Sequence, residues 1–188
     1  TLAGTEGDDV IYGYSTNDSI SVLGGNDIMY AADGHDNVQG GNGSDQLFGD
    51  AGNDRLYGDA DDDLLFGGDG FDILEGGTGN DRLEGGDGED RYGFSAGWGF
   101  DVILDTAGSD DVVSFSEVLP STLLFRRDGL DLLVTDRATG EPVLRIVGQF
   151  SNVADVRGST AIESFLFSTG PTGSYMGYDG VKLLVLEG

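Results

Sequence analysis

GGDGFDILEGGTGNDRLEGGDGEDRY, residues 67–92, repeats one nine-residue pattern three times. Each copy begins with two glycines at positions one and two, followed by glycine at position four, aspartate at position six and a large apolar residue at position eight. An aspartate and an apolar residue kept in fixed phase within glycine-rich sequence indicate a repeated structural unit rather than a biased composition.

The pattern extends back to Gly4 as ten consecutive units with a strict step of nine. Position four is Gly in eight units, the exceptions being Thr16 and Asp61. Position six is Asp in all ten units: Asp9, Asp18, Asp27, Asp36, Asp45, Asp54, Asp63, Asp72, Asp81 and Asp90. Position eight is apolar in all ten: Ile11, Ile20, Met29, Val38, Leu47, Leu56, Leu65, Leu74, Leu83 and Tyr92.

The residue types predict the geometry of one unit. Six residues rich in Gly, Asn and Asp favour a turn, because these residues tolerate positive φ. The remaining three form a short strand in which position eight faces inward and positions seven and nine face outward. One unit cannot bury its apolar residue alone. Two units therefore make an eighteen-residue coil, and stacked coils bury a narrow core between two parallel sheets, an all-β parallel β-roll.

In such a roll the position-six aspartates form one column along each edge, with neighbours roughly 4.8 Å apart. Carboxylates at that spacing repel one another strongly, so a cation is expected between them. Carboxylates and turn carbonyls form an all-oxygen ligand set that suits Ca²⁺ better than zinc or copper, and Mg²⁺ demands stricter geometry. A solvated acidic face or a disordered linker would not need position eight in strict phase, although we expect the calcium-free chain to be unfolded.

Charge and composition exclude several functions. The net charge is −26, and residues 1–93 hold 22 acidic against 3 basic residues. So acidic a chain is expected to repel nucleic acid and anionic membranes and to bind cations. It has no Cys, hence no disulfide or thiolate metal site, and no apolar stretch of membrane-spanning length. Residues 1–3 do not begin a signal peptide, and the absence of an initiator Met suggests a fragment of a longer protein.

The units match G-G-x-G-x-D-x-U-x, and residues 4–93 resemble the RTX, or haemolysin-type, calcium-binding repeat family. The resemblance implies a parallel β-roll, type I secretion, and calcium held between one turn and the turn two units later. The earlier turn would give its carbonyls at positions two and four, the later turn those at positions one and three, and both their position-six Asp. Ten turns paired in this way allow about eight calcium ions.

Three implied ligand sets are the clearest. They are Gly41, Gly43 and Asp45 with Gly58, Ala60 and Asp63; Asp50, Gly52 and Asp54 with Gly67, Asp69 and Asp72; and Gly68, Gly70 and Asp72 with Gly85, Asp87 and Asp90. The remaining candidate ligands are Gly7, Asp9, Asp18, Gly24, Gly25, Asp27, Asp33, Gly34, Asp36, Gly40, Asn42, Gly49, Ala51, Asp59, Asp61, Gly76, Gly77, Thr78, Gly79, Asp81, Gly86, Gly88 and Gly99.

The sequence departs from the family pattern mainly near the N-terminus. Tyr14 and Thr16 replace glycines, as do Val22 and Leu23, and Asp61 occupies a glycine position in the seventh unit. The cleanest sites are therefore expected between residues 40 and 93.

The chain divides into a predicted roll (1–93), degenerate closing turns (94–115) and a β-rich C-terminal cap (116–188). Asp101 and Asp110 are candidates to close the last calcium sites. Beyond them, residues 123–136, 142–150 and 162–167 resemble the domain that commonly follows these repeats and are expected to form strands. A solenoid needs a capped end, and the C-terminal part, with Trp98, is the expected cap and folding nucleus.

Odd and even units should lie in different sheets, so their outward residues can be compared. Odd units present Val10/Tyr12, Ile28/Tyr30, Gln46/Phe48, Leu64/Phe66 and Arg82/Glu84. This odd face is apolar with an aromatic column, whereas the even face is mostly polar. The column either steadies parallel strands, docks a neighbouring domain or a second copy, or binds a glycan.

No catalytic site is expected: His35 is the only histidine, at position five of a turn, and no nucleophile–base set can be assembled. The sequence thus predicts a secreted or cell-surface calcium-binding module of a type I-secreted bacterial protein that folds on meeting extracellular Ca²⁺. The alternatives are a calcium-dependent adhesion or ligand-binding module, or the non-catalytic tail of a protease, lipase or epimerase. Residues 182–188, KLLVLEG, would be part of a secretion signal or a final strand.

Overall fold

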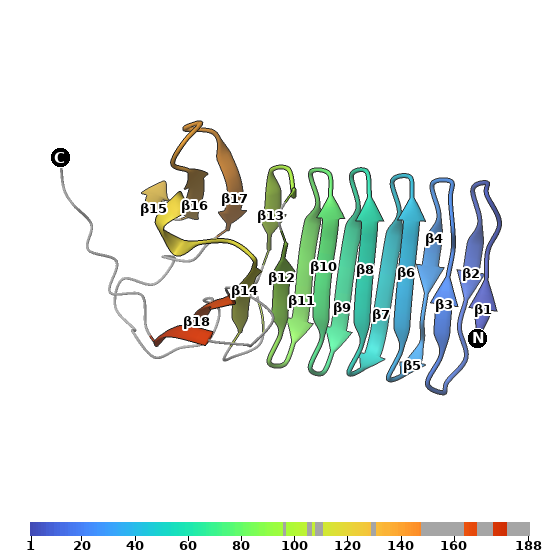
Figure 1. The fold of residues 1–188 in the computed structure, drawn as a ribbon. Helices are drawn as coiled ribbons and strands as arrows, with labels where there is room; N and C mark the ends of the chain where they lie inside the picture. The colour runs from blue at the N-terminus through green and yellow to red at the C-terminus, as the bar shows by residue number, and fades with distance from the viewer. Residues whose placement is uncertain are drawn as a thin grey trace.

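The computed structural model describes residues 1–95, 97–104, 107, 111–128, 131–147, 164–168 and 175–179. Within them the chain forms β-strands and one short 3₁₀ helix, Pro120–Thr122. Figure 1 shows the strands lying side by side along one axis, with the N-terminus at one end and the C-terminal strands at the other. The predicted segment 182–188 and the residues of 148–163 lie outside the described part.

The repeats form strands that alternate between two sheets. They are β1 (Leu2–Ala3), β2 (Val10–Tyr12), β3 (Ser19–Ser21), β4 (Ile28–Tyr30), β5 (Asp33–Gly34), β6 (Asn37–Asn42), β7 (Gln46–Gly52), β8 (Arg55–Ala60), β9 (Leu64–Asp69), β10 (Ile73–Thr78), β11 (Arg82–Asp87) and β12 (Arg91–Phe94). The even sheet has the order β1-β3-β6-β8-β10-β12, and the odd sheet β11-β9-β7-β4-β2 with β5 beside β7. All these pairings are parallel, which confirms the predicted β-roll.

The register between neighbouring strands is constant: each residue pairs with the residue one coil later in the chain. Met29 pairs with Leu47, Leu47 with Leu65 and Leu65 with Leu83, each step being eighteen residues. Position-eight side chains fill the space between the sheets and are fully buried from Met29 to Tyr92, whereas Ile11 in the first coil is only half-buried. Burying a Leu-sized side chain contributes about 1.5–3 kcal/mol, so each coil gains only two such contributions. The core is therefore long and thin.

The strands are longer than the three residues expected from the sequence. β2, β3 and β4 have three residues, but β6 and β8 to β11 have six and β7 has seven. In the longer strands the pairing continues into the turn, as between Gly41 and Asp59 and between Asn42 and Ala60. Because successive coils are in constant register, the turn backbones also lie beside one another and extend the parallel ladder.

The C-terminal strands extend both sheets beyond the last repeat. They are β13 (Asp101–Ile103), β14 (Val112–Ser116), β15 (Leu123–Asp128), β16 (Asp131–Asp136), β17 (Pro142–Ile146), β18 (Ser164–Ser168) and β19 (Tyr175–Asp179). The even sheet continues as β12-β14-β18-β19 and the odd sheet as β11-β13-β17-β16-β15. Strands are thus present in the described parts of 123–136, 142–150 and 162–167, as expected. The three-part division of the chain remains a prediction, because both sheets run across its boundaries.

The pairing changes from parallel to antiparallel at the C-terminal end. β17 pairs parallel with β13 but antiparallel with β16, and β18 pairs parallel with β14 but antiparallel with β19. Trp98 packs against Phe94 and Phe115, with ring centroids 5.9 Å from each. Hairpins and an aromatic cluster therefore cover this end of the roll, as a capped solenoid requires.

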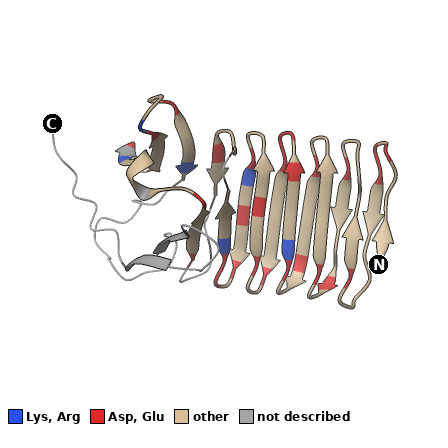
Figure 2. Ribbon diagram, in the orientation of Figure 1, with Lys and Arg blue, Asp and Glu red and all other residues tan. Residues whose placement is uncertain are grey.

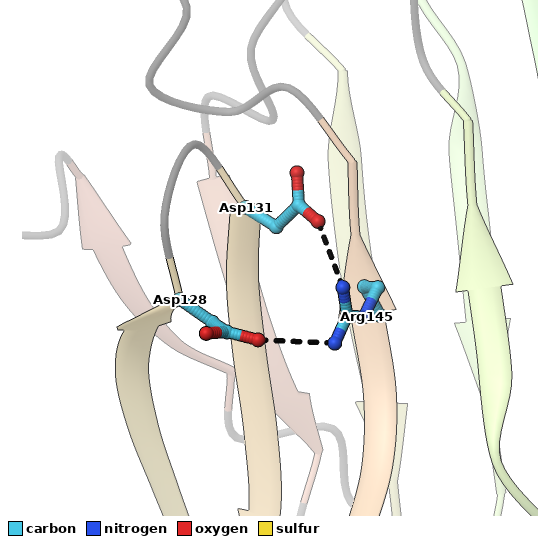
Figure 3. A network of polar contacts seen from close by, with 3 residues as sticks. All are labelled: Asp128, Asp131 and Arg145. Atoms are coloured by element: carbon cyan, nitrogen blue, oxygen red, sulfur yellow. Dashed lines mark hydrogen bonds and ion pairs between the residues drawn. The ribbon is translucent and has the colours of Figure 1, made fainter.

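One arginine joins the hairpin to the last parallel strand (Figure 3). Arg145 on β17 donates from Nη1 to Asp131 Oδ2 and from Nη2 to Asp128 Oδ2, both at 3.0 Å. Asp128 ends β15 and Asp131 begins β16, so the guanidinium spans the two ends of the hairpin turn. The groups are partly exposed, so this network is expected to contribute no more than about 1 kcal/mol and mainly to orient the hairpin.

The odd face carries the aromatic column as a stack. Tyr12–Tyr30, Tyr30–Phe48 and Phe48–Phe66 have ring centroids 5.1, 4.8 and 4.8 Å apart and planes within 10° of parallel. Each ring face between the two ends of the stack is covered by its neighbours. Such pairs contribute beyond their buried area, and they favour the interpretation in which the column stabilises the parallel sheet.

From the third unit onward, positions two and four of the turns lie in the left-handed backbone region, with Gly34 as the exception. Glycine occupies most of these positions, but Leu23, Ala32, Asp50, Asp59 and Asp61 also have φ between 70° and 78°. Asp61 therefore adopts the conformation of the glycine that it replaces. At Gly43, with φ of 112°, a Cβ would also collide with the carbonyl of Gly25 in the preceding coil.

We therefore expect Gly43→Ala to destabilise the calcium-loaded roll by about 2 kcal/mol or more, since both the φ angle and the carbonyl contact oppose a side chain. For a chain of this length that corresponds to a Tm about 4–8 °C lower, measured by thermal unfolding with excess calcium. Gly7→Ala is the control, because Gly7 holds the same repeat position but has open space around it and no positive φ. Equal Tm values for the two variants would contradict this account of the turn.

Candidate calcium sites

The position-six aspartates form a continuous column along each edge of the roll. In each pair, the backbone N–H of one aspartate donates to Oδ1 of the aspartate one coil later, at 2.6–3.0 Å. The column on the odd edge runs Asp9, Asp27, Asp45, Asp63, Asp81 and Asp101, and that on the even edge Asp18, Asp36, Asp54, Asp72, Asp90 and Asp111. The predicted alignment of these residues is therefore present.

The second oxygen of these carboxylates lies inside the turns. From Asp27 onward the column residues are no more than 1% exposed. Oδ2 is buried without a hydrogen-bond partner in Asp27, Asp36, Asp45, Asp54, Asp63, Asp72, Asp81, Asp90 and Asp101. A buried carboxylate oxygen with no donor is strongly unfavourable unless it is protonated or bound to a cation. Each column therefore presents a row of carboxylate oxygens that can bind a cation.

Main-chain carbonyls converge on the same points. A Cβ placed on Gly40 would lie 2.5 Å from Asp45 Oδ2 and 2.7 Å from the carbonyl oxygen of Gly58, one coil later. The same arrangement recurs at Gly49, where the atoms are Asp54 Oδ2 at 2.6 Å and the Gly67 carbonyl at 2.5 Å. A position-six carboxylate and the position-one carbonyl of the turn two units later, both implied ligands of one ion, thus lie together.

This set of oxygens fits calcium. Carboxylate and carbonyl oxygens are hard ligands, and Ca²⁺ accepts six to eight of them in irregular geometry. Among the described residues, no three His, Cys, Asp or Glu side chains cluster as a metal site. That result agrees with a site in which each ion meets only two carboxylates and takes its other ligands from the backbone. Figure 2 shows acidic residues recurring at the turns on both edges of the roll.

Burial raises the pKa of the column carboxyls, and nearby carboxylates add to the effect. The pKa is raised to about 6 in Asp45, Asp54, Asp81 and Asp90, to about 7 in Asp72 and Asp101, and to about 8 in Asp63. In Asp27 and Asp36, nearer the N-terminus, desolvation also raises the pKa. The metal-free roll would therefore hold protons near neutral pH where the metal-bound roll holds calcium.

The two ends of the columns differ from the middle. At the N-terminal end Asp9 is half-buried, and the side chains of Val22 and Ala31 are buried at position one, where later units have glycine beside Oδ2. At the C-terminal end Asp101 is buried and continues the odd column, while its role as a calcium ligand stays a prediction. Asp110 lies outside the described residues, and its neighbour Asp111, which was not predicted, accepts from the Asp90 N–H at 2.7 Å. The buried Val113 two residues later is the sequence signal for Asp111, but Val112 gives Asp110 the same signal.

His35 is exposed, as expected for position five of a turn, but its ring is not simply solvated. Nδ1 accepts a hydrogen bond from the backbone N–H of Asn53 at 2.8 Å. The ring thus acts as an acceptor between two coils. Within the described residues no helix is long and apolar enough to cross a membrane.

The fold and the carboxylate columns together define a calcium-binding parallel β-roll. The family described as RTX calcium-binding nonapeptide repeat (4 copies) matches residues 1–29, 30–65 and 66–97, just over half of the chain. The chain belongs to this family, whose repeats bind calcium and are typical of proteins secreted by type I systems. No curated protein sequence matches the chain.

Eleven solved chains are similar in structure. One is the extracellular lipase LipA from Serratia marcescens, with 16% identity, a TM-score of 0.38, and coverage of 77% of this chain and 37% of the lipase. Another is the AlgE6R3 subunit of the Azotobacter vinelandii mannuronan C5-epimerase, with 22% identity, a TM-score of 0.33 and coverage of 90% of each chain. The chain thus spans little more than a third of the length of the lipase that it matches.

We expect Asp72→Asn to reduce the number of bound calcium ions by about one or two, because Asp72 is an implied ligand of two sites and a neutral amide is a weaker calcium ligand. Equilibrium dialysis with metal analysis measures the number of ions per chain. Asp69→Asn is the matched control: it removes the same charge from an exposed side chain and leaves the backbone carbonyl in place. The same ion count in both variants would refute the assignment of the buried column.

Calcium binding to a roll that is already folded should weaken as the pH falls from 8.5 to 5.5. The raised pKa values mean that the metal-free roll takes up protons through this range, which calcium must displace. For each carboxyl the affinity falls roughly tenfold per pH unit below its pKa. The stability of the metal-free roll has the opposite sign: it rises as the pH falls through these raised pKa values toward the ordinary 3.8 of the unfolded chain.

Calorimetric calcium titrations in two buffers of different protonation enthalpy measure both the affinity and the protons released. Equal affinities at pH 5.5 and 8.5, with no proton release, would show that the column carboxyls are ionised before calcium binds, as they are in an unfolded chain with ordinary Asp pKa values.

Proposed function

We propose that this chain is a calcium-dependent folding module of a type I-secreted bacterial protein, acting outside the cell or at its surface. The observation that carries the proposal is the row of buried carboxylate oxygens without donors along both edges of the roll. These oxygens make the folded state dependent on a cation. Calcium binding would thereby be coupled to folding, and the module would assist the export and folding of its parent protein.

The energetics of folding support a chain that is unfolded without calcium and folded with it. The calcium-free chain has a thin core, a net charge of −26 and nine column aspartates that would be buried either protonated or unpaired. Each calcium ion that binds only the folded state adds RT ln(1 + [Ca²⁺]/Kd) to stability, about 2.7 kcal/mol at a hundred times Kd. Extracellular modules bind calcium with Kd of about 10⁻⁴–10⁻³ M. The chain would then stay unfolded in the cytosol and coil after export.

The ligand sets implied by the family pattern extend along the columns, and about eight ions would follow from ten turns paired two units apart. The convergence of Asp45 Oδ2 with the Gly58 carbonyl, and of Asp54 Oδ2 with the Gly67 carbonyl, supports the first two sets. Folding would start from the C-terminal strands, because β13 and β14 offer a paired edge on which the last repeat coil can form.

A structural role for the carboxylates is favoured over a catalytic one. The column aspartates are held in an internal hydrogen-bonded array, and His35 accepts a backbone hydrogen bond on the opposite, exposed side of the turn. Neither arrangement pairs a nucleophile with a base, which catalysis by these residues would need.

Adhesion through the odd face receives less support. The ring stack leaves edges rather than faces exposed along its length, and sugars bind aromatic residues chiefly through ring faces. Four neighbouring strands, each taken as three residues long with two side chains facing outward, cover on the order of 200 Å². A stable protein interface needs about 800 Å² from each partner. A partner that docks here would therefore also have to contact surface beyond the aromatic column.

The test is a calcium titration of the purified chain followed by far-UV circular dichroism and by its hydrodynamic radius. In excess chelator we expect an expanded, largely unfolded chain, and in millimolar calcium a compact β-rich one, with a cooperative transition between about 10⁻⁴ and 10⁻³ M. Magnesium at the same concentration is the control and should leave the chain unfolded. A compact β-rich chain in chelator would refute the folding switch.

A further inference from the structure

A second hydrogen-bond ladder joins the coils through position five, directly before the column aspartates. On the even edge, Asn17 Oδ1 accepts from the His35 N–H at 3.1 Å, His35 Nδ1 from the Asn53 N–H at 2.8 Å, and Asn53 Oδ1 from the Phe71 N–H at 3.1 Å. On the odd edge the acceptor–donor pairs are Asp8–Asn26, Asn26–Ser44, Asp62–Asn80 and Asn80–Phe100, at 2.8–3.0 Å.

The two ladders run in opposite directions. A position-six N–H donates to the aspartate of the following coil, whereas a position-five N–H donates to the side chain of the preceding coil. Consecutive N–H groups of an extended backbone point in opposite directions, which explains the alternation. Each turn is therefore hydrogen-bonded to both neighbouring coils. Its position-six N–H donates to the aspartate of the following coil, and its position-five N–H donates to the position-five side chain of the preceding coil.

We propose that the position-five side chain is a positioning residue for calcium binding: it keeps successive turns in register, so that the carboxylate of one coil and the carbonyls of the next lie at the distance one ion requires. This inference rests on the proposed function, because it concerns the same sites. The acceptor atom matters rather than the residue type, since Asn, Asp and the unprotonated Nδ1 of His35 all serve.

The ladder has gaps where the side chain is no suitable acceptor. Phe71 occupies position five of the eighth unit, so it offers no acceptor to the N–H of Glu89 one coil later. Phe71 is 37% exposed, which leaves room for a polar replacement. A hydrogen-bond acceptor at position 71 should add one hydrogen bond to this ladder, from the Glu89 N–H. The new bond would lie next to Asp72 and Asp90, two column aspartates of the regular repeats.

The experiment has a loss arm and a gain arm, both measured in the full chain by calcium titration and by thermal unfolding in excess calcium. Asn53→Ala should lower the Tm by about 1–4 °C and raise the calcium midpoint, because one hydrogen bond changes the folding equilibrium about two- to tenfold. Asn53→Asp keeps the acceptor and should restore both values. Asn37→Ala removes an exposed amide from β6, outside the ladder, and should change neither.

In the gain arm, Phe71→Asn should raise the Tm and lower the calcium midpoint relative to Phe71→Ala, which lacks both the ring and the acceptor. The proposal is overturned if Asn53→Asp behaves like Asn53→Ala, or if Phe71→Asn is no better than Phe71→Ala. The wild-type titration distinguishes the failure of this proposal from the failure of the proposed function. A wild-type chain that folds without calcium refutes the folding switch. Calcium-dependent folding that the position-five variants leave unchanged refutes only the role of position five.

Discussion

The structure depends on carboxylates that are stacked one coil apart and turned away from water. Each column aspartate uses one oxygen to accept a backbone hydrogen bond and holds the other in a buried position among backbone carbonyls. Such an arrangement is unfavourable for an ionised acid in isolation and favourable for an acid bound to a cation. The fold thus places groups suited to bind a cation along both edges, and the family to which the chain belongs uses its repeats to bind calcium.

The other repeat positions serve this constraint. Position eight supplies one apolar side chain per unit, buried from Ile20 onward, and these side chains form the thin core between the two sheets. Glycine at position one leaves room for a carboxylate oxygen and a carbonyl, and the left-handed residues at positions two and four bend the turn. The position-five acceptors hold each turn to its predecessor. At the C-terminus, antiparallel hairpins and the Trp98 cluster cover the end of the stack.

Much of this was predictable from one chain because the repeat period is exact. A step of nine and a coil of eighteen predict the register of Met29, Leu47 and Leu65, the burial of position eight and the alignment of the aspartates, all of which the structure confirms. The aromatic column followed from the same count. Beyond residue 93 the period is lost. Asp110 was predicted to close a calcium site and Asp111 was not, although an apolar residue follows each of them at the same distance.

The sequence by itself determined the period and the parallel roll and predicted an all-oxygen set of calcium ligands, because each follows from residue types at fixed spacing. Only the tertiary structure decided how far the strands extend into the turns, that Asp111 closes the even column, that aromatic rings face one another, and that position five joins the coils. These features depend on which backbone groups of two coils point at each other, and that direction is set by stacking rather than by the composition of one unit.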